Sequence, residues 1–425
     1  MAAYAMLIVL LALVLAPGGF LAFADQPPAV AAPAVSPQDE ALARPLAAEG
    51  ISAYERGDYA AAVDSLTHAQ ALVPSNSSIA LYLGLAYLKQ GNPRGAIAAW
   101  QTYGKLKPST TAETRNNLRD KVNGYVTLLQ RRQDLDQARQ EVAREREIGP
   151  GNPNTVAITY YRNLGSPDLG PLQKGLTALL IADVSKVPGI EVVERERLQA
   201  LLDEMKLGTS GLATPGTAAR TGRLLGAGRV ATGSYVNPTT GEMRIDSVLA
   251  QTSSARVVGS QAANGKVIHF YDVEKQLAAQ ILSDLGYDKA RLQAAGVYTR
   301  VAQPQTTSYP AFVAFSRGLD AKDRQDYADA RSLFQQALTY DPNFEAARRE
   351  LLHTPLSALS VAEIETSVGA GAPSVPAVMV ALGGSAELKI PPAPPVLPVV
   401  SPPVCPPCPV VRVPPAPPLM RPPRG

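Results

Sequence analysis

The sequence predicts a multidomain α+β protein, in which all-α helical hairpins flank an α/β domain that has a mixed β-sheet. Two observations support this fold class. Glycines and prolines recur with a spacing of 34 residues before residue 110, and strand patterns alternate with amphipathic helices over residues 151–290. A third observation, the proline-rich composition within residues 354–425, predicts a disordered tail.

The bulk composition limits the function classes. A chain of 425 residues is too long for one ordinary core, so several folded units are expected. The net charge of +3, from 40 basic and 37 acidic residues, predicts no nucleic-acid binding. The only cysteines are Cys405 and Cys408, both in the predicted tail, so the folded parts should contain no disulfide and no thiolate metal site.

The first 24 residues predict a cleavable signal peptide. They carry no charged side chain, and their apolar run over residues 5–16 ends at Pro17. Ala22-Phe23-Ala24 then provides the small-x-small pattern of a cleavage site, and an Ala/Pro linker over residues 25–40 follows. An uncleaved anchor is the alternative, but the run is short for a span of about 20 residues. No cysteine lies near the site, so we expect a periplasmic protein without a lipoprotein anchor.

Residues 41–109 predict two tetratricopeptide (TPR) repeats, because 34 residues is the period of that repeat. Gly50 and Gly84 are small where the first helix of each repeat should meet the second. The predicted packing residues of the first repeat are Gly50, Gly57, Tyr59, Ala62, Leu66 and Pro74. Those of the second repeat are Gly84, Gly91, Ala96, Trp100 and Pro108.

Two repeats are marginal alone, because each buries its apolar face on a neighbour. The segment 110–150 is the predicted cap. It carries apolar residues at helical spacing: Leu118, Val122, Tyr125, Val126 and Leu129. Beyond Gln130 the segment is almost entirely polar, which predicts that the helix extends into solvent.

Residues 151–290 predict an α/β domain with the element order β-α-β-α-α-β-β-β-α. Alternating apolar and polar residues over 243–249 predict a strand with one wet face. A third repeat with one extra helix is predicted over residues 305–353, since 24 residues separate Gly318 from Pro342, as they separate Gly50 from Pro74. Its packing residues are Gly318, Tyr327, Ala330, Phe334 and Pro342.

Three segments of the α/β domain carry a family resemblance. They read VVERERL at 192–198, LLDEMKLGTSGL at 201–212 and GRLLGAGRVATGS at 222–234. Together they resemble the CsgG family of curli production and assembly components, over about residues 154–286. The domain is also similar to the amino-terminal domain of TolB and to FlgO-type proteins. The motif residues are Glu194, Arg195, Arg197, Leu198, Gly226, Ala227, Gly233 and Ser234.

The chemistry of the motif favours a structural role. We interpret the charges of residues 194–197 as solvated charges at a helix start, with partner binding as the alternative. Gly226 and Ala227 should let a helix and a strand meet closely, and Gly233-Ser234 predicts a close backbone approach or a bulge. The resemblance implies a place in envelope assembly and transfers no catalytic or binding residue.

We expect no catalytic residue, cofactor or metal site. His68, His269 and His353 lie in separate segments, and Cys405 and Cys408 are set among prolines, which favours an opportunistic disulfide over catalysis. The predicted function is a non-enzymatic periplasmic scaffold, peripherally associated with the outer membrane. It would bind envelope proteins through TPR grooves and form homo-oligomers through the CsgG-like domain.

The alternative function is a subunit of a curli-type outer-membrane secretion channel. The missing lipidation cysteine and the short connection at 237–242 argue against it. An envelope hydrolase, a third interpretation, rests on chain length alone.

Overall fold

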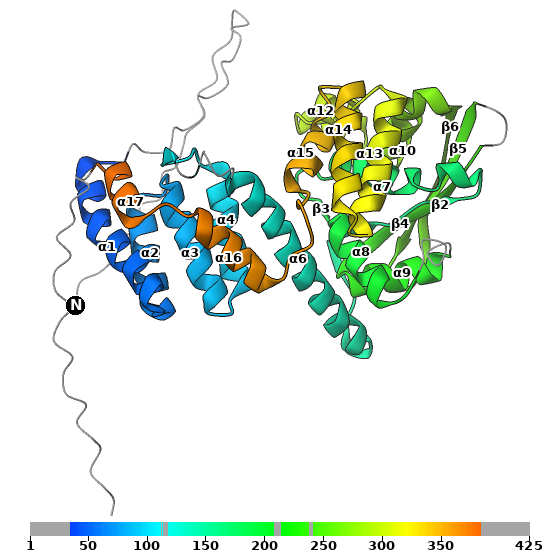
Figure 1. The fold of residues 1–425 in the computed structure, drawn as a ribbon. Helices are drawn as coiled ribbons and strands as arrows, with labels where there is room; N and C mark the ends of the chain where they lie inside the picture. The colour runs from blue at the N-terminus through cyan, green and yellow to red at the C-terminus, as the bar shows by residue number, and fades with distance from the viewer. Residues whose placement is uncertain (1–34, 112, 114–117, 208–213, 238–240, 384–425) are drawn as a thin grey trace, which may run out of the picture. The chain divides into compact units, whose positions relative to one another are not determined.

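The computed structural model describes residues 35–383 apart from residues 112, 114–117, 208–213 and 238–240 (Figure 1). It confirms the predicted fold class, with helical hairpins and a mixed six-stranded sheet. The predicted signal peptide and both cysteines lie outside the described residues, as does the proline-rich segment from residue 384 onward.

Four helices form two hairpins at the start of the described chain. They are α1 (Pro37–Arg56), α2 (Tyr59–Leu72), α3 (Ser77–Lys89) and α4 (Pro93–Lys105). The side chains of Ser36, Asp58, Asn76 and Asn92 cap these helices by accepting a backbone N–H bond. The helix α1 starts at Pro37, within the predicted linker, because Ser36 caps it and a proline is favoured in the first turn.

The long helix α6 (Leu118–Ala143) contributes to two cores. Its first half is buried with α1 to α4, through side chains that include Val122 and Leu129. Its second half packs on a helix of the α/β domain, where Ala138 is buried and Leu135 and Val142 adjoin the same core. The prediction that this half extends into solvent was therefore wrong. Three apolar residues spaced three and four apart are enough to bury one face of a polar helix.

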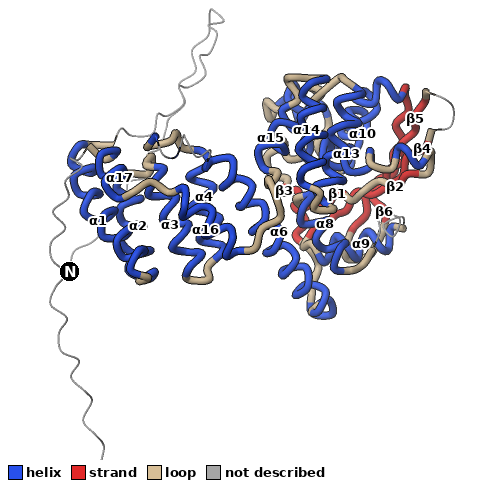
Figure 2. The backbone as a smooth tube through the Cα atoms, viewed as in Figure 1, coloured by secondary structure: helices blue, strands red, loops and turns tan. Residues whose placement is uncertain are grey.

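The sheet, whose strands are red in Figure 2, combines parallel and antiparallel pairs. Its strands are β1 (Asn152–Ile158), β2 (Arg162–Asn163), β3 (Glu191–Val192), β4 (Ala227–Val236), β5 (Glu242–Gln251) and β6 (Val257–Lys266). The order is β3-β1-β4-β5-β6, and β2 pairs with β4. The pairs of β1 with β3 and β4 are parallel, whereas β4, β5 and β6 form an antiparallel meander.

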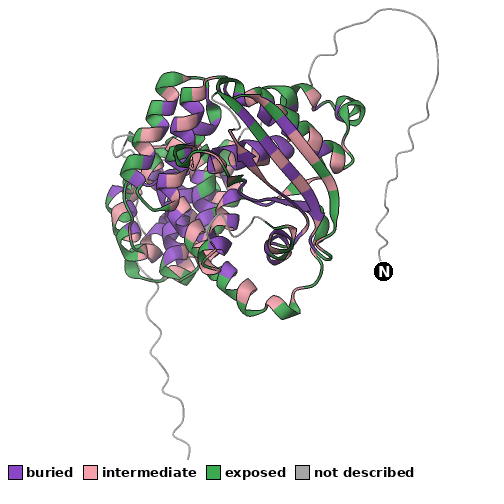
Figure 3. Cartoon of the chain, turned by 90° about the vertical axis from the view of Figure 1, so that its right-hand side faces the viewer, coloured by how far each residue is buried: buried purple, intermediate pink, exposed green. Residues whose placement is uncertain are grey.

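Helices cover both faces of the sheet. One core contains α7 (Leu172–Val184) and α10 (Phe270–Asp284), and the opposite core contains α8 (Arg195–Glu204) and α9 (Pro215–Leu224). The period of two places Val156 and Ile158 in the first core and Ala157 in the second. Figure 3 colours the strands by burial and shows buried residues interspersed with less buried ones. On β5, Met243 and Ile245 are buried whereas Arg244 is exposed.

The helices after the sheet extend the first of these cores. They are α11 (Lys289–Ala294), α12 (Tyr298–Ala302), α13 (Tyr309–Asp323), α14 (Tyr327–Tyr340) and α15 (Glu345–His353). The rings of Phe270 and Phe312 stack with centroids 4.0 Å apart, and Phe334 and Phe344 are buried in the same core. The hairpin α13–α14 therefore packs on the α/β domain through shared apolar side chains. Short 3₁₀ helices lie at Glu145–Glu147, Pro167–Leu169 and Val267–His269.

All three hairpins use the same close approach. In each, a glycine of the first helix lies against a large side chain sixteen residues later in the second helix. A Cβ atom would lie 2.6 Å from Leu66 at Gly50, 2.1 Å from Trp100 at Gly84, and 2.6 Å from Phe334 at Gly318. Glycine is needed at these positions because a larger residue would push the two helices apart.

The described chain ends with two helices, α16 (Val361–Gly371) and α17 (Val375–Ala381). They correct the prediction that disorder begins at residue 354. Ser360 and Glu363 form a capping box, and Ile364 and Val368 follow at the i, i+4 spacing of a buried helix face. The proline content that suggested disorder is concentrated beyond residue 390.

Candidate functional site

Two of the charged residues at the start of α8, Arg195 and Glu196, belong to an ion-pair cluster that is largely buried. The Arg195 side chain is 4% exposed, and its Nη1 donates to both carboxylate oxygens of Asp323, at 2.8 and 3.0 Å. Its Nη2 donates to Glu196 at 2.9 Å, and Nη1 also reaches the Tyr160 hydroxyl at 3.3 Å. The interpretation of residues 194–197 as solvated charges was therefore wrong for Arg195.

Asp323 lies at the end of α13 and holds a second cation. Lys174 on α7 is 8% exposed and approaches Asp323 at 2.7 Å and Asp320 at 3.1 Å. Lys322, next to Asp323, pairs with Glu350 on α15 at 2.7 Å. We call this set the charge cluster: Lys174, Arg195, Glu196, Asp320, Lys322, Asp323 and Glu350. It connects α7, α8, α13 and α15, and each buried charge has an opposite partner, as burial requires.

The cluster controls the protonation of its own members. Burial alone would raise the pKa of Glu196, but Arg195 and Lys322 lower it to about 2. Burial alone would lower the pKa of Lys322, but Glu350 and Glu196 raise it above its usual value. Both groups therefore stay charged near neutral pH, which suits a structural ion-pair network.

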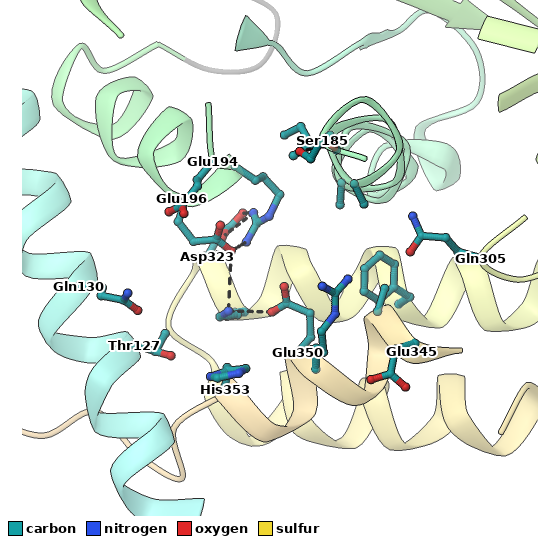
Figure 4. A pocket seen from close by; sticks show the side chains of 18 of the residues that line it. Thr127, Gln130, Ser185, Glu194, Glu196, Gln305, Asp323, Glu345, Glu350 and His353 are labelled. Atoms are coloured by element: carbon teal, nitrogen blue, oxygen red, sulfur yellow. Dashed lines mark hydrogen bonds and ion pairs between the residues drawn. The ribbon is translucent and has the colours of Figure 1, made fainter. Parts of the chain in front are cut away.

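A cavity of about 1060 Å³ adjoins the cluster (Figure 4). Its polar lining comes from α6, from the start of α8, from residues 303–305 and from α15. Burial, together with Glu194 and Glu196, raises the pKa of Asp134 in its wall to about 6. Partial burial and the charge of Lys322 lower the pKa of His353.

Two amide groups of the cavity lining have unused hydrogen-bonding capacity. The Nε2 atoms of Gln133 and Gln305 are buried and have no hydrogen-bond partner within the described part of the chain. Such donors suit the carbonyl groups of a polar ligand or a peptide. Across the described ranges, no group of three or more histidine, cysteine or acidic residues is arranged to hold a metal ion.

The N-terminal hairpins present a second candidate surface. The first helices of the hairpins, α1 and α3, together with α6, contact α16 and α17. We call the contacted surface of α1, α3 and α6 the A-helix face. Ile364, Val368, Val378 and Met379 are fully buried in the core of these helices. The protein's own helices α16 and α17 therefore cover the A-helix face.

The predicted TPR packing residues lie within the three hairpins or directly after them. Gly57 and Gly91 adopt positive φ values of 84° and 71° at the turns between helices. Pro74, Pro108 and Pro342 follow α2, α4 and α14. The other packing side chains that the structure buries are Ala62, Leu66, Ala96, Trp100, Tyr327, Ala330 and Phe334, while Tyr59 is half-buried at the start of α2.

The family-motif residues divide between ion pairs and packing. Arg197 pairs with Glu141 of α6 at 2.6 Å, Leu198 is buried, and Glu194 lines the cavity. Gly226 has a φ of 73° before β4, which Ala227 begins.

The structure decides between the two expectations for Gly233-Ser234. These residues pair with Ser247 and Asp246 in unbroken register. A Cβ on Gly233 would lie 2.0 Å from a backbone oxygen of Asp246. The feature is therefore a close backbone approach and not a bulge.

Sequence reasoning missed the partners of the motif. Lys174, Lys322, Asp323 and Glu350 come from three helices and carry no local signal of their pairing. It also missed α16 and α17, although the capping-box pattern of Ser360 and Glu363 before an apolar i, i+4 pair was present.

Two parts of the chain match known families. Residues 47–108 match the tetratricopeptide repeat, and residues 133–238 match the family described as curli production assembly/transport component CsgG. The second match begins in the half of α6 that packs on α8. These matches support the recognition of a CsgG family domain and of TPR repeats.

The similarity to a solved structure is low. The solved structure of the LpoB C-terminal domain from Salmonella enterica is 15% identical, covering 30% of this chain and 94% of that one, with a TM-score of 0.23. A search of curated proteins returned no match. In the part of the chain that the structure describes, no helix has the length and apolar character needed to cross a membrane.

Proposed function

We propose that this protein is a non-enzymatic scaffold of the cell envelope, located in the periplasm or peripherally at the outer membrane, which binds other envelope proteins. One observation carries the proposal: α6 is buried in the TPR core through its first half and in the CsgG-like core through its second. Since one helix serves both cores, the repeats and the CsgG-like domain are joined as one binding unit. The matched family's description as an assembly/transport component supports envelope assembly as the setting.

The cavity beside the charge cluster is the proposed partner site of this unit. Its wall offers both signs of charge, including Asp134 and Arg349, and the unpaired amide donors of Gln133 and Gln305. These groups fit an extended polar segment of a partner, whose backbone carbonyls would accept from the amides.

Site-specific cross-linking tests the proposal. A photo-crosslinking amino acid would replace Gln305 in the cavity, and in a matched control would replace Asp64, whose side chain is 76% exposed on α2. We expect a reproducible envelope-protein adduct from position 305 and none from position 64. Recovery of only the uncross-linked monomer from both variants would contradict the scaffold function.

The alternative is a subunit of a secretion channel, which the word transport in the matched family's description favours. In that case the CsgG-like domain would form homo-oligomeric rings. Electron microscopy of detergent-extracted protein separates the two functions, because rings with a lumen would support the channel and isolated particles the scaffold.

A further inference from the structure

We infer that the A-helix face is a binding surface for an apolar helical segment that carries one acidic residue, and that residues 360–382 are its resident occupant. A partner segment of the same chemistry would displace this occupant. The inference rests on the proposed scaffold function, because it names the kind of partner segment that the repeats receive. The observation behind it is that the occupant follows the face from α6 across α3 to α1.

The apolar contacts define the first requirement for a partner. Ile364 and Val368 lie one turn apart on α16 and are 0% exposed, as are Val378 and Met379 on α17. All four are buried in the core of the N-terminal helices. A competing segment therefore needs aliphatic residues at i, i+4 spacing, the pattern by which helices bind apolar surfaces.

Two polar contacts of the face reach backbone carbonyls, whereas a third joins the side-chain hydroxyls of Tyr125 and Ser367, 2.9 Å apart. The Tyr82 hydroxyl donates to the Pro373 carbonyl at 2.7 Å, and Arg132 donates to the Leu359 carbonyl at 2.8 Å. Every peptide has such carbonyls, so these bonds are available to a partner of another sequence.

One ion pair supplies selectivity. Lys89 of α3 contacts Glu365 of α16 at 2.7 Å, and the Glu365 side chain is 13% exposed. A partner segment that lacked an acidic residue at this place would leave Lys89 without its counter-charge.

The occupant is suited to exchange because its helices are short. The helices α16 and α17 have 11 and 7 residues, below the roughly 12–15 residues at which isolated helices become stable in water. They therefore depend on the face for their structure. Because the occupant is part of the same chain, its effective concentration at the face is about 1 mM. If the occupant binds the face with an intrinsic Kd of about 10 μM, it weakens the binding of a free competing segment about 100-fold.

The test uses the full chain with C405S and C408S, and a fluorescent peptide of residues 357–383 as the probe. The open variant is I364D/V368D. The locked variant is L118C/G371C, because a Cβ at Gly371 would lie 3.0 Å from the Leu118 Cγ, which fits the position of a disulfide sulfur. We expect the open variant to bind the probe at least tenfold more tightly than the parent chain. The oxidised locked variant should bind at least tenfold more weakly than the parent, and reduction should restore binding.

A charge swap tests the selectivity. In the open background, a probe with Glu365→Lys should bind at least fivefold more weakly, and Lys89→Glu should reverse the preference. Equal binding by open and locked chains, or no reversal on the swap, would overturn the inference. So would a parent chain that dimerises by exchanging residues 360–382, because the occupant in trans would then be a second copy.

A second measurement covers the case in which the open variant fails to fold, as judged by circular dichroism and Trp100 emission. Hydrogen exchange on the parent chain should show loss of protection in α16 when the probe is added in excess, and no loss with the Glu365→Lys probe. Unchanged protection with both probes would refute the exchange. Cross-linking from position 305 is independent of these results, so it can fail or succeed whether or not the face exchanges its occupant.

Discussion

Replacing Asp323 by asparagine would remove the negative charge that two buried cations share. Arg195 and Lys174 contact Asp323 at 2.8 and 2.7 Å, and all three side chains are less than 10% exposed. Removing one partner of a buried ion pair costs about 3–5 kcal/mol, because the remaining charge stays buried. Here Arg195 retains Glu196 and Lys174 retains Asp320. We therefore expect the lower end of that range, about 3 kcal/mol.

Urea unfolding followed by circular dichroism measures this loss. The control is Asp136→Asn on α6, which removes an ion pair with Arg139 in which both side chains are more than 60% exposed. That change should leave stability unmoved, since exposed pairs contribute little. A double-mutant cycle of D323N with R195Q should show a coupling of about 1–3 kcal/mol. If D323N costs less than about 1 kcal/mol, the cluster does not hold α13 on α7 and α8, and the reasoning fails.

Three further predictions concern packing and protonation. Gly84→Ala should cost about 1–3 kcal/mol in urea unfolding followed by Trp100 fluorescence, because the new methyl would lie 2.1–2.7 Å from three ring atoms of Trp100. Burial and the neighbouring Asp183 raise the pKa of Glu274, so the folded state holds this proton more tightly than the unfolded state. The contribution of Glu274 to stability is then greatest below its unfolded pKa of about 4.3 and falls as the pH rises toward the raised value. Glu274→Gln, measured by urea midpoints between pH 4 and 8, should remove this fall. The pKa of Asp134 is raised to about 6, so the folded protein should also lose stability, on the order of 1 kcal/mol, between pH 4 and 6. Asp134→Asn should remove this smaller loss. A pH profile that either substitution leaves unchanged would contradict the corresponding assignment.

The features that the sequence predicted are those that depend on the spacing of residues close together in the chain. Each hairpin places a glycine against a large side chain sixteen residues later, so the 34-residue period of Gly50 and Gly84 reports a contact between neighbouring helices. The strand β5 was predictable for the same reason, because alternation reports which face is buried.

The features that the sequence did not predict depend on distant pairing. Arg195 and Asp323 are 128 residues apart, and nothing near either residue indicates the other. An arginine at a helix start is usually solvated, so local reasoning chose the wrong environment. The helices α16 and α17 were not predicted for a different reason: the disorder expected of the proline-rich segment beyond residue 390 was extended back to residue 354.

The N-terminal hairpins and the hairpin α13–α14 bury their apolar faces on different neighbouring helices. A TPR hairpin buries its apolar face on a neighbour. For α13–α14 that neighbour is α7, where a Cβ on Gly175 would lie 1.9 Å from the Ser316 hydroxyl oxygen, and the charge cluster fixes the contact. For α1–α4 the neighbours are α6 and the short helices α16 and α17. Among the described residues, Lys89 and Glu365 form the only ion pair that involves α16 or α17. Opening the A-helix face should therefore leave the packing of α13–α14 on α7 intact. Breaking the charge cluster should disrupt that packing.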